Sequence, residues 1–199
     1  VRLTSKPDSP VTISFSSSNL NEGTVMSEIT FDSSNWDQPQ LVYTTGIDDF
    51  PPVADGPQDY NITVTSIFSL DPNYGTIDPN AFDPIIFTNQ DNDSPAVIVK
   101  VLNDDYTTSE DLESIIIGFK LTSEPNSWVD IPLSIGSNSD EVDLGDNSVR
   151  IEKENWDDFF LNQVTLSGID DPIIDGDQTF EFITGAPISL ALFYGILYP

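Results

Sequence analysis

Two stretches decide the fold: Val11-Thr12-Ile13-Ser14-Phe15 and Tyr60-Asn61-Ile62-Thr63-Val64. Apolar and polar side chains alternate along both of them. This period of two places the apolar side chains on one face of a β-strand and the polar ones on the other. Residues 97–101 and 114–119 add two short runs rich in β-branched residues, which favour strands. Clusters of Pro, Gly, Asn and Asp separate such runs about every ten residues, which is typical of a β-sandwich. We therefore predict an all-β protein, with at most a helical turn leading into Trp36 and into Trp156.

The chain repeats itself at a period of about 120 residues. Five short motifs occur twice in the same order: Leu3-Thr4-Ser5 as Leu121-Thr122-Ser123, Asn35-Trp36-Asp37 as Asn155-Trp156-Asp157, Gly46-Ile47-Asp48-Asp49 as Gly168-Ile169-Asp170-Asp171, Asp55-Gly56 as Asp175-Gly176, and Tyr74-Gly75 as Tyr194-Gly195. Such an ordered set is hard to obtain by accident, so the sequence predicts two tandem copies of one domain.

This ordered set, closed by Asn89-Gln90-Asp91-Asn92-Asp93, resembles the Calx-β and Calx-β-like repeats. The resemblance covers nearly the whole chain. It implies two tandem immunoglobulin-like Greek-key β-sandwich domains, of the kind found in arrays in large extracellular and surface proteins. Members of that family serve as adhesins, spacers and calcium sensors, so the resemblance is more specific for fold than for function.

Comparison of the two copies indicates which terminal strands each domain contains within this chain. Val1 corresponds to Phe119, so the domain at 1–94 lacks the opening strand that the second copy has from Val97 onward. The domain at 95–199 has that strand but stops at Pro199, the equivalent of Pro79, and so lacks a closing strand. The terminal strands are thus incomplete within the chain. Two interpretations stay open: a complete subunit, or a fragment of a longer array.

Composition excludes several classes of function. The 199 residues include 34 acidic and six basic side chains, no histidine and no cysteine, for a formal net charge of -28. Without histidine and cysteine there are neither Ser-His-Asp nor Cys-His nucleophiles, nor the usual transition-metal ligands. The negative charge argues against nucleic acid as a partner, and no stretch reaches the roughly 20 apolar residues of a membrane span. Paired aspartates recur in both copies, which suits a structural or metal role better than a glycosidase site. We expect a non-enzymatic protein outside the cell or on its surface.

Many carboxylates without histidine or cysteine favour a hard cation, Ca²⁺ before others. The resemblance implies that Ca²⁺ binds at one tip of the domain, beside the linker, through the residues at these positions: Asp48, Asp49, Asp55, Asp91, Asp93 and Glu110. The second copy keeps Asp170, Asp171 and Asp175 but not the closing motif, so its site is short of ligands. The alternative, which weighs equally, is that these side chains only cap backbone groups in turns.

Two kinds of feature in the sequence point to carbohydrate: glycosylation sequons and tryptophan side chains. Asn61 and Asn92 each begin an Asn-x-Ser/Thr sequon, the acceptor of N-linked glycans. Trp36 and Trp156 recur in register and are expected to anchor the packing. Trp128 has no counterpart in the first copy, so it is a candidate platform for a sugar.

The C-terminal tail differs from its counterpart in the first copy. Residues 69–79 form a polar stretch, whereas residues 189–199 carry no charge. As a strand, the tail would place five large apolar side chains on one face: Leu190, Leu192, Tyr194, Ile196 and Tyr198. Since the first domain lacks its opening strand, the tail of one subunit is predicted to fill that place in the next by β-strand addition, which yields an open filament. The equally weighted alternative is that the tail folds back in cis.

Together these features favour a structural subunit or segment of an extracellular fibre or surface adhesin that associates head-to-tail with copies of itself. The alternative is a calcium-dependent module, within a larger surface protein, that binds a glycan or another partner.

Overall fold

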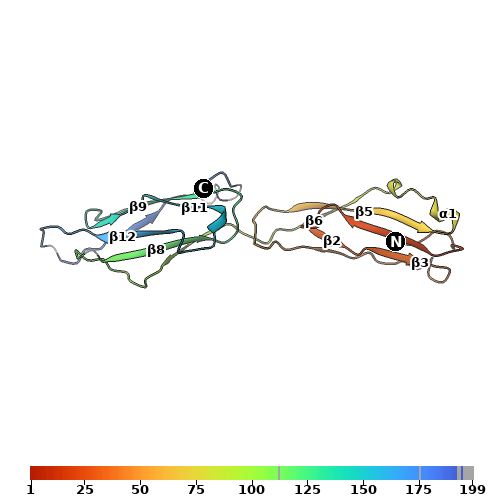
Figure 1. Cartoon of the computed structure of the whole chain (residues 1–199), viewed down its shortest axis with the longest axis horizontal. Coiled ribbons are helices and arrows are strands. Elements are labelled where there is room, and N and C mark those ends of the chain that lie inside the picture. Colours follow the sequence, from red (N-terminus) through yellow and green to blue (C-terminus); the bar gives the residue numbers. More distant parts are fainter. Residues whose placement is uncertain (112, 175, 192–193, 195–199) are drawn as a thin grey trace. The chain divides into compact units, whose positions relative to one another are not determined.

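The computed structural model describes residues 1–111, 113–174, 176–191 and 194, and these are almost entirely β-structure. The predicted all-β class is thereby confirmed. The chain divides into two compact units (Figure 1): Val1–Asp49 with Gly56–Asn92, and Phe50–Asp55 with Asp93–Pro199. Segment Phe50–Asp55, which the sequence analysis assigned to the first domain, therefore groups with the second unit. There the Glu124 N–H donates to the Pro52 carbonyl at 2.7 Å.

The first unit contains two antiparallel sheets. Its elements are β1 (Val11–Ser17), β2 (Gly23–Val25), β3 (Glu28–Phe31), β4 (Thr44–Gly46), β5 (Gln58–Ser69), the one-turn helix α1 (Pro72–Gly75), the 3-10 turn η1 (Pro79–Ala81) and β6 (Ile85–Asn89). One sheet has the order β3-β1-β5-β6, and β2 pairs with β4 in the other. The core between them is formed by Leu3, Val11, Ile13, Ile29, Phe31 and Tyr74, with Met26 and Val42 packed against it from the β2–β4 side.

In its described residues, the second unit also contains two antiparallel sheets. Its elements are β7 (Val97–Val101), β8 (Ser114–Leu121), β9 (Val129–Ile135), β10 (Val142–Leu144), β11 (Ser148–Ile151), the 3-10 turn η2 (Lys153–Asn155), β12 (Gln163–Gly168), β13 (Phe182–Thr184) and β14 (Ile188–Ser189). One sheet has the order β10-β12-β8-β7, and β11-β9-β13 forms the other, with β14 also on β9. Apolar side chains of β8 and β12 pack against those of β9 and β11 to make the core.

The predicted strands lie where the alternation placed them. Residues 11–15 fall in β1, where Val11 and Ile13 are buried, and residues 60–64 fall in β5. Residues 97–101 form β7, and 114–119 lie within β8. The 3-10 turn η2 leads into Trp156, as predicted, and a hydrogen-bonded turn reaches Trp36.

The repeated motifs make the same contacts in both units. The Tyr74 hydroxyl donates to the Ser5 carbonyl at 2.6 Å, and the Tyr194 hydroxyl donates to the Ser123 carbonyl at 2.7 Å. Likewise, the backbone N–H groups of Leu3 and Leu121 donate to the carbonyls of Trp36 and Trp156, respectively. The similarity between the copies therefore reflects equivalent packing and not only similar letters.

The two units differ at one sheet. In the second unit β12 lies between β10 and β8, with Val164 opposite Ile117 and Leu166 opposite Ile115. In the described part of the first unit, β4 pairs with β2 alone. Whereas β12 begins at Gln163, the counterpart of Leu41, β4 begins only at Thr44. Residues 41–43 lack the neighbouring strand that orders their counterparts in β12.

Candidate functional site

The six predicted calcium ligands are distributed over both units. Asp48, Asp49 and Asp91 belong to the first unit, whereas the second contains Asp55, Asp93 and Glu110. Within the residues that the structure describes, no three Asp, Glu, His or Cys side chains are grouped as metal ligands. The six carboxylates thus remain predicted ligands.

Two of these carboxylates bind backbone groups. Asp91 Oδ2 accepts a hydrogen bond from the Gly56 N–H at 2.7 Å, and Asp93 Oδ2 accepts one from the Val53 N–H at 3.0 Å. Both bonds join residues far apart in the sequence, so they differ from the local turn caps of the alternative interpretation.

Asn89, the first residue of the closing motif at 89–93, binds the carboxylate of Glu22, which was not among the predicted site residues. Glu22 is buried, and its Oε2 accepts a hydrogen bond from Asn89 Nδ2 at 3.2 Å. The same Nδ2 donates to the Ile47 carbonyl at 2.6 Å. Asn89 therefore joins the loop after β4 to the loop before β2. A signal existed in the sequence, because Glu22-Gly23 is matched by Glu141-Val142 in the second copy.

Glu110 lies at a polar cleft of about 550 Å³ in the second unit. Asp111, Glu141 and Asp177 line the same cleft. Several carboxylates around one cleft repel one another unless a cation joins them. Of the six predicted ligands, Glu110 is the one that lines this cleft.

Other aspartates cap local turns. The Ser34 hydroxyl holds the pKa of Asp32 below its ordinary value, and the Thr107 hydroxyl does the same for Asp105. For Asp71 the main cause of a lowered pKa is the hydrogen bond from the Asp8 N–H at 2.9 Å. These three carboxylates are thus engaged in hydrogen bonds within their own units.

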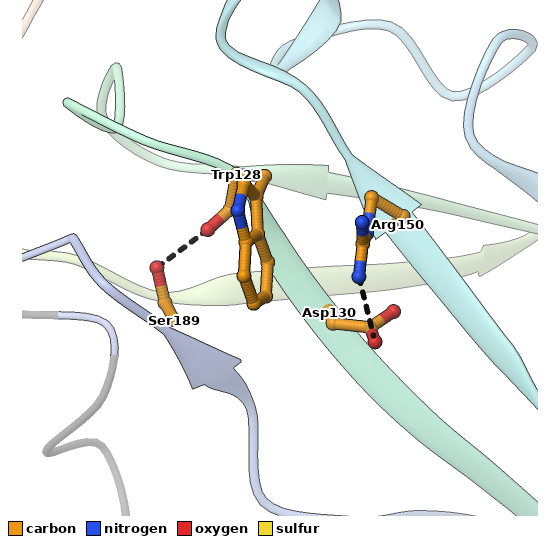
Figure 2. A network of polar contacts seen from close by, with 4 residues as sticks. All are labelled: Trp128, Asp130, Arg150 and Ser189. Atoms are coloured by element: carbon orange, nitrogen blue, oxygen red, sulfur yellow. Dashed lines mark hydrogen bonds and ion pairs between the residues drawn. The ribbon is translucent and has the colours of Figure 1, made fainter.

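Trp128 belongs to a polar network on the second unit (Figure 2), and its ring is half-buried. The Arg150 guanidinium lies 4.3 Å from the Trp128 ring centroid, and its Nη2 is 3.5 Å from Asp130 Oδ2. Ser189 donates its hydroxyl hydrogen to the Trp128 carbonyl at 2.6 Å. In the first unit, hydroxyls of Thr12 and Thr30 take the places of Asp130 and Arg150, 3.0 Å apart. Arg150 covers one face of the indole, and a sugar platform needs an open face.

Trp36 and Trp156 are partly buried and pack against the cores of their own units. They occupy equivalent places, as expected of packing anchors, but each keeps a solvent-exposed part that the sequence analysis did not predict. The sequons also differ from each other: Asn92 is exposed after β6, whereas Asn61 is half-buried within β5.

The predicted assembly strand is described at two of its five positions. Leu190 is 80% exposed, whereas Tyr194 is 3% exposed and bound to Ser123 of its own unit. Leu192, Ile196 and Tyr198 lie outside the described residues. The place of Tyr194 favours the cis alternative for the tail up to this residue.

An apolar groove of about 270 Å³ lies on the first unit. Its lining includes Ile13, Ile62 and Val64 from one sheet, Val25 from the other, and Val42 from the segment before β4. The lining is mainly apolar, and Asp83 also lies on it.

No family model matches the chain, and no curated protein does so either. Among the described residues, no helix is long and apolar enough to cross a membrane.

Proposed function

We propose that this chain is a structural segment or subunit of an extracellular fibre or surface adhesin, built from two tandem immunoglobulin-like Greek-key sandwiches of the Calx-β-like type. One observation carries the proposal: the two units repeat the same stabilising contacts, from Tyr74 with Ser5 to Tyr194 with Ser123. A duplicated scaffold suits a protein whose task is to extend and withstand force, because each copy adds length and an independent core.

The acidity supports the same proposal. A net charge of -28 keeps an extended surface protein soluble and limits non-specific contacts with other acidic surfaces. Within this proposal, calcium at the predicted carboxylates would stiffen the segment, as the resemblance to Calx-β repeats implies.

The binding-module alternative depends on Trp128. Its ring is half-buried and one face is covered by Arg150, so the described geometry gives it little surface for a sugar. The scaffold proposal therefore has the stronger physical support.

Single-molecule pulling of the whole chain between attached handles tests the proposal. We expect two separate unfolding events, since each unit has its own core. A glycan array tests the binding-module alternative in parallel. We expect that neither the wild-type chain nor Trp128→Ala binds to the array. One cooperative event, or glycan retention that the Trp128 variant abolishes, would contradict the scaffold proposal and favour a binding module.

A further inference from the structure

One short turn occurs in both units but is covered in only one of them. In the second unit Ser123 is fully buried, and the Glu124 side chain is 19% exposed. In the first unit their counterparts Ser5 and Lys6 are both exposed. Each serine still bonds the equivalent tyrosine of its own unit, so the difference lies in what covers the turn.

The turn of the second unit is covered by segment Phe50–Asp55, which belongs to the same unit. The Glu124 N–H donates to the Pro52 carbonyl at 2.7 Å. Val53 and Pro125 line one cavity of about 250 Å³, together with Glu124. The covering segment therefore offers the turn an apolar tip and a carbonyl acceptor.

The chain contains a second copy of this covering segment. Residues 172–176 correspond to residues 52–56, since both stretches begin with Pro and end with Asp-Gly. Gly56 and Gly176 both have a positive φ, of 77° and 74°. Because glycine adopts such a φ readily, both copies leave the segment through a similar backbone turn.

The apolar tip of this second copy is exposed to solvent. Ile173, the counterpart of Val53, is 61% exposed, and Ile174 is fully exposed. The Ile173 N–H donates to Asp171 Oδ1 at 2.7 Å, a local bond of the kind that shapes turns. We call these two residues the isoleucine tip. Its burial on another surface would be favourable, because both side chains would leave water.

Charge distinguishes the two copies of the turn as partners for this tip. Asp170 and Asp177 flank the tip in sequence, and both are exposed. Glu124 would repel these carboxylates, whereas Lys6 would attract them. Within the part of the chain that the structure describes, Lys6 has no ion-pair partner, and Glu124 lies 2.7 Å from Lys153 Nζ. The lysine turn, residues 5–8 of the first unit, is therefore the copy that fits the tip.

From these observations we propose that the isoleucine tip docks on the lysine turn of a second copy of this chain. In this contact the Pro172 carbonyl accepts a hydrogen bond from the Lys6 N–H. The bond repeats the one that joins Pro52 to Glu124 within the second unit. The contact joins two different surfaces, so it propagates head-to-tail. This inference rests on the proposed function, for which it names the two surfaces that connect the copies.

Sedimentation equilibrium of the whole chain at rising concentration tests the proposal. A salt concentration of about 0.15 M, with a Debye length of about 8 Å, screens the repulsion between copies of net charge -28. We expect weak association, with a Kd of about 0.1–0.5 mM, because the tip is much smaller than a standard interface. A weight-average mass that stays at the value of one chain up to about 1 mM would overturn the proposal.

A matched pair of variants tests the tip itself. Ile173→Asp with Ile174→Asp removes the apolar tip and should weaken the association more than about tenfold. Phe160→Asp with Leu161→Asp is the control, because it adds the same charge at two adjacent, exposed apolar residues of the same unit. The control should associate like the wild type. Unchanged association of the tip variant, or an equal loss in both variants, would overturn the proposal.

A charge reversal tests the lysine turn as the partner surface. Lys6→Glu and Asp177→Lys should each weaken the association about two- to fivefold, because each one places like charges across the contact. The chain with both changes should associate more tightly than the product of the two losses predicts, since opposite charges face each other again. Losses that simply multiply would overturn the pairing of the tip with this turn.

Failure of this contact and failure of the proposed function give different results. A chain that does not self-associate still has two separate cores, so the two unfolding events in the pulling experiment remain. Conversely, glycan retention through Trp128 would overturn the scaffold proposal but would leave the association through the isoleucine tip unchanged.

Discussion

At the scale of single residues, two tyrosine hydroxyls make equivalent hydrogen bonds across the two units, each to a serine about 70 residues earlier in the chain. Tyr74→Phe and Tyr194→Phe remove the hydroxyl but keep the ring, so the carbonyls of Ser5 and Ser123 lose a hydrogen bond. Each change should lower the free energy of unfolding by about 1–3 kcal/mol. The larger loss is expected for Tyr194, since Ser123 is fully buried. Urea denaturation measures the effect, and Tyr106→Phe, an exposed tyrosine, should show none. Equal stability of all three variants and the wild type would contradict this role.

Asp71 makes the first unit sensitive to acid. Its carboxylate accepts hydrogen bonds from the N–H groups of Asp8 and Asn73, which hold its pKa below the ordinary value. A lowered folded-state pKa means that the carboxylate contributes stability above its unfolded pKa of about 3.9 and loses it as the pH falls through the folded-state pKa. Asp71→Asn removes the charge, so its stability deficit relative to the wild type should shrink from about pH 6 to about pH 2.

Urea denaturation at a series of pH values measures that deficit. Asp78→Asn is the matched control, because Asp78 caps η1 in the same way but is exposed. It measures the effect of removing an exposed capping carboxylate from the same unit. A deficit for Asp71→Asn that stays constant down to about pH 2 would show that the charge of Asp71 contributes nothing.

At the scale of elements, the strands with alternating or β-branched residues were predictable from sequence. The pattern that predicts such a strand lies entirely within the strand's own segment. They did not predict the bounds of β4, because strand length there depends on a neighbour distant in sequence. The helix α1 was missed as well: its single turn follows from Asp71, whose side chain caps the Asn73 N–H, and no helical period precedes it.

Contacts between strands were the least predictable part of the candidate site. Arg150 meets Asp130 only because β11 and β9 pair in a register that places the two residues opposite each other. Register depends on the whole sheet and not on the residues around Trp128. The carboxylate set was predictable as a list of residue types, but its distribution over the two units was not.

The turns before β4 and β12 should respond alike to mutation. Trp36 and Trp156 pack against the cores while part of each ring stays in solvent. Trp36→Ala and Trp156→Ala should therefore each lower the unfolding free energy by about 2–3 kcal/mol, less than full burial would imply. Thermal unfolding monitored by circular dichroism tests this, with Trp36→Phe and Trp156→Phe as milder controls. Variants that melt like the wild type would place these rings on the surface and revive the sugar-platform interpretation.

At the scale of the whole molecule, the predicted calcium ligands occur in both units, so binding should stabilise the chain broadly. At a Ca²⁺ concentration about 100 times Kd, the gain in unfolding free energy should be about 2–3 kcal/mol. Asp91→Asn with Asp93→Asn keeps an acceptor for the Gly56 and Val53 N–H groups while removing two charges, and it should abolish the gain.

Scanning calorimetry with and without a chelator measures that gain. The matched control is Asp37→Asn with Asp143→Asn, two exposed residues outside the predicted set, which should respond to Ca²⁺ as the wild type does. An unchanged melting temperature in about 10 mM Ca²⁺, above the range of extracellular calcium modules, would leave these aspartates with their backbone hydrogen bonds alone.

Two deletions in the C-terminal tail can separate its role in folding from a role in self-association. Ala191 and Tyr194 are buried in the core of the second unit, so deletion of residues 191–199 should lower its melting temperature by several degrees, about 5–10 °C. Deletion of residues 195–199 alone keeps both side chains, and we expect it to leave melting and self-association unchanged. Sedimentation velocity at rising concentration, with electron microscopy for filaments, compares the two deletions with the whole chain. If filaments form with the whole chain and vanish when only residues 195–199 are removed, Ile196 and Tyr198 act in trans, and the donor-strand prediction replaces the cis interpretation that Tyr194 supports.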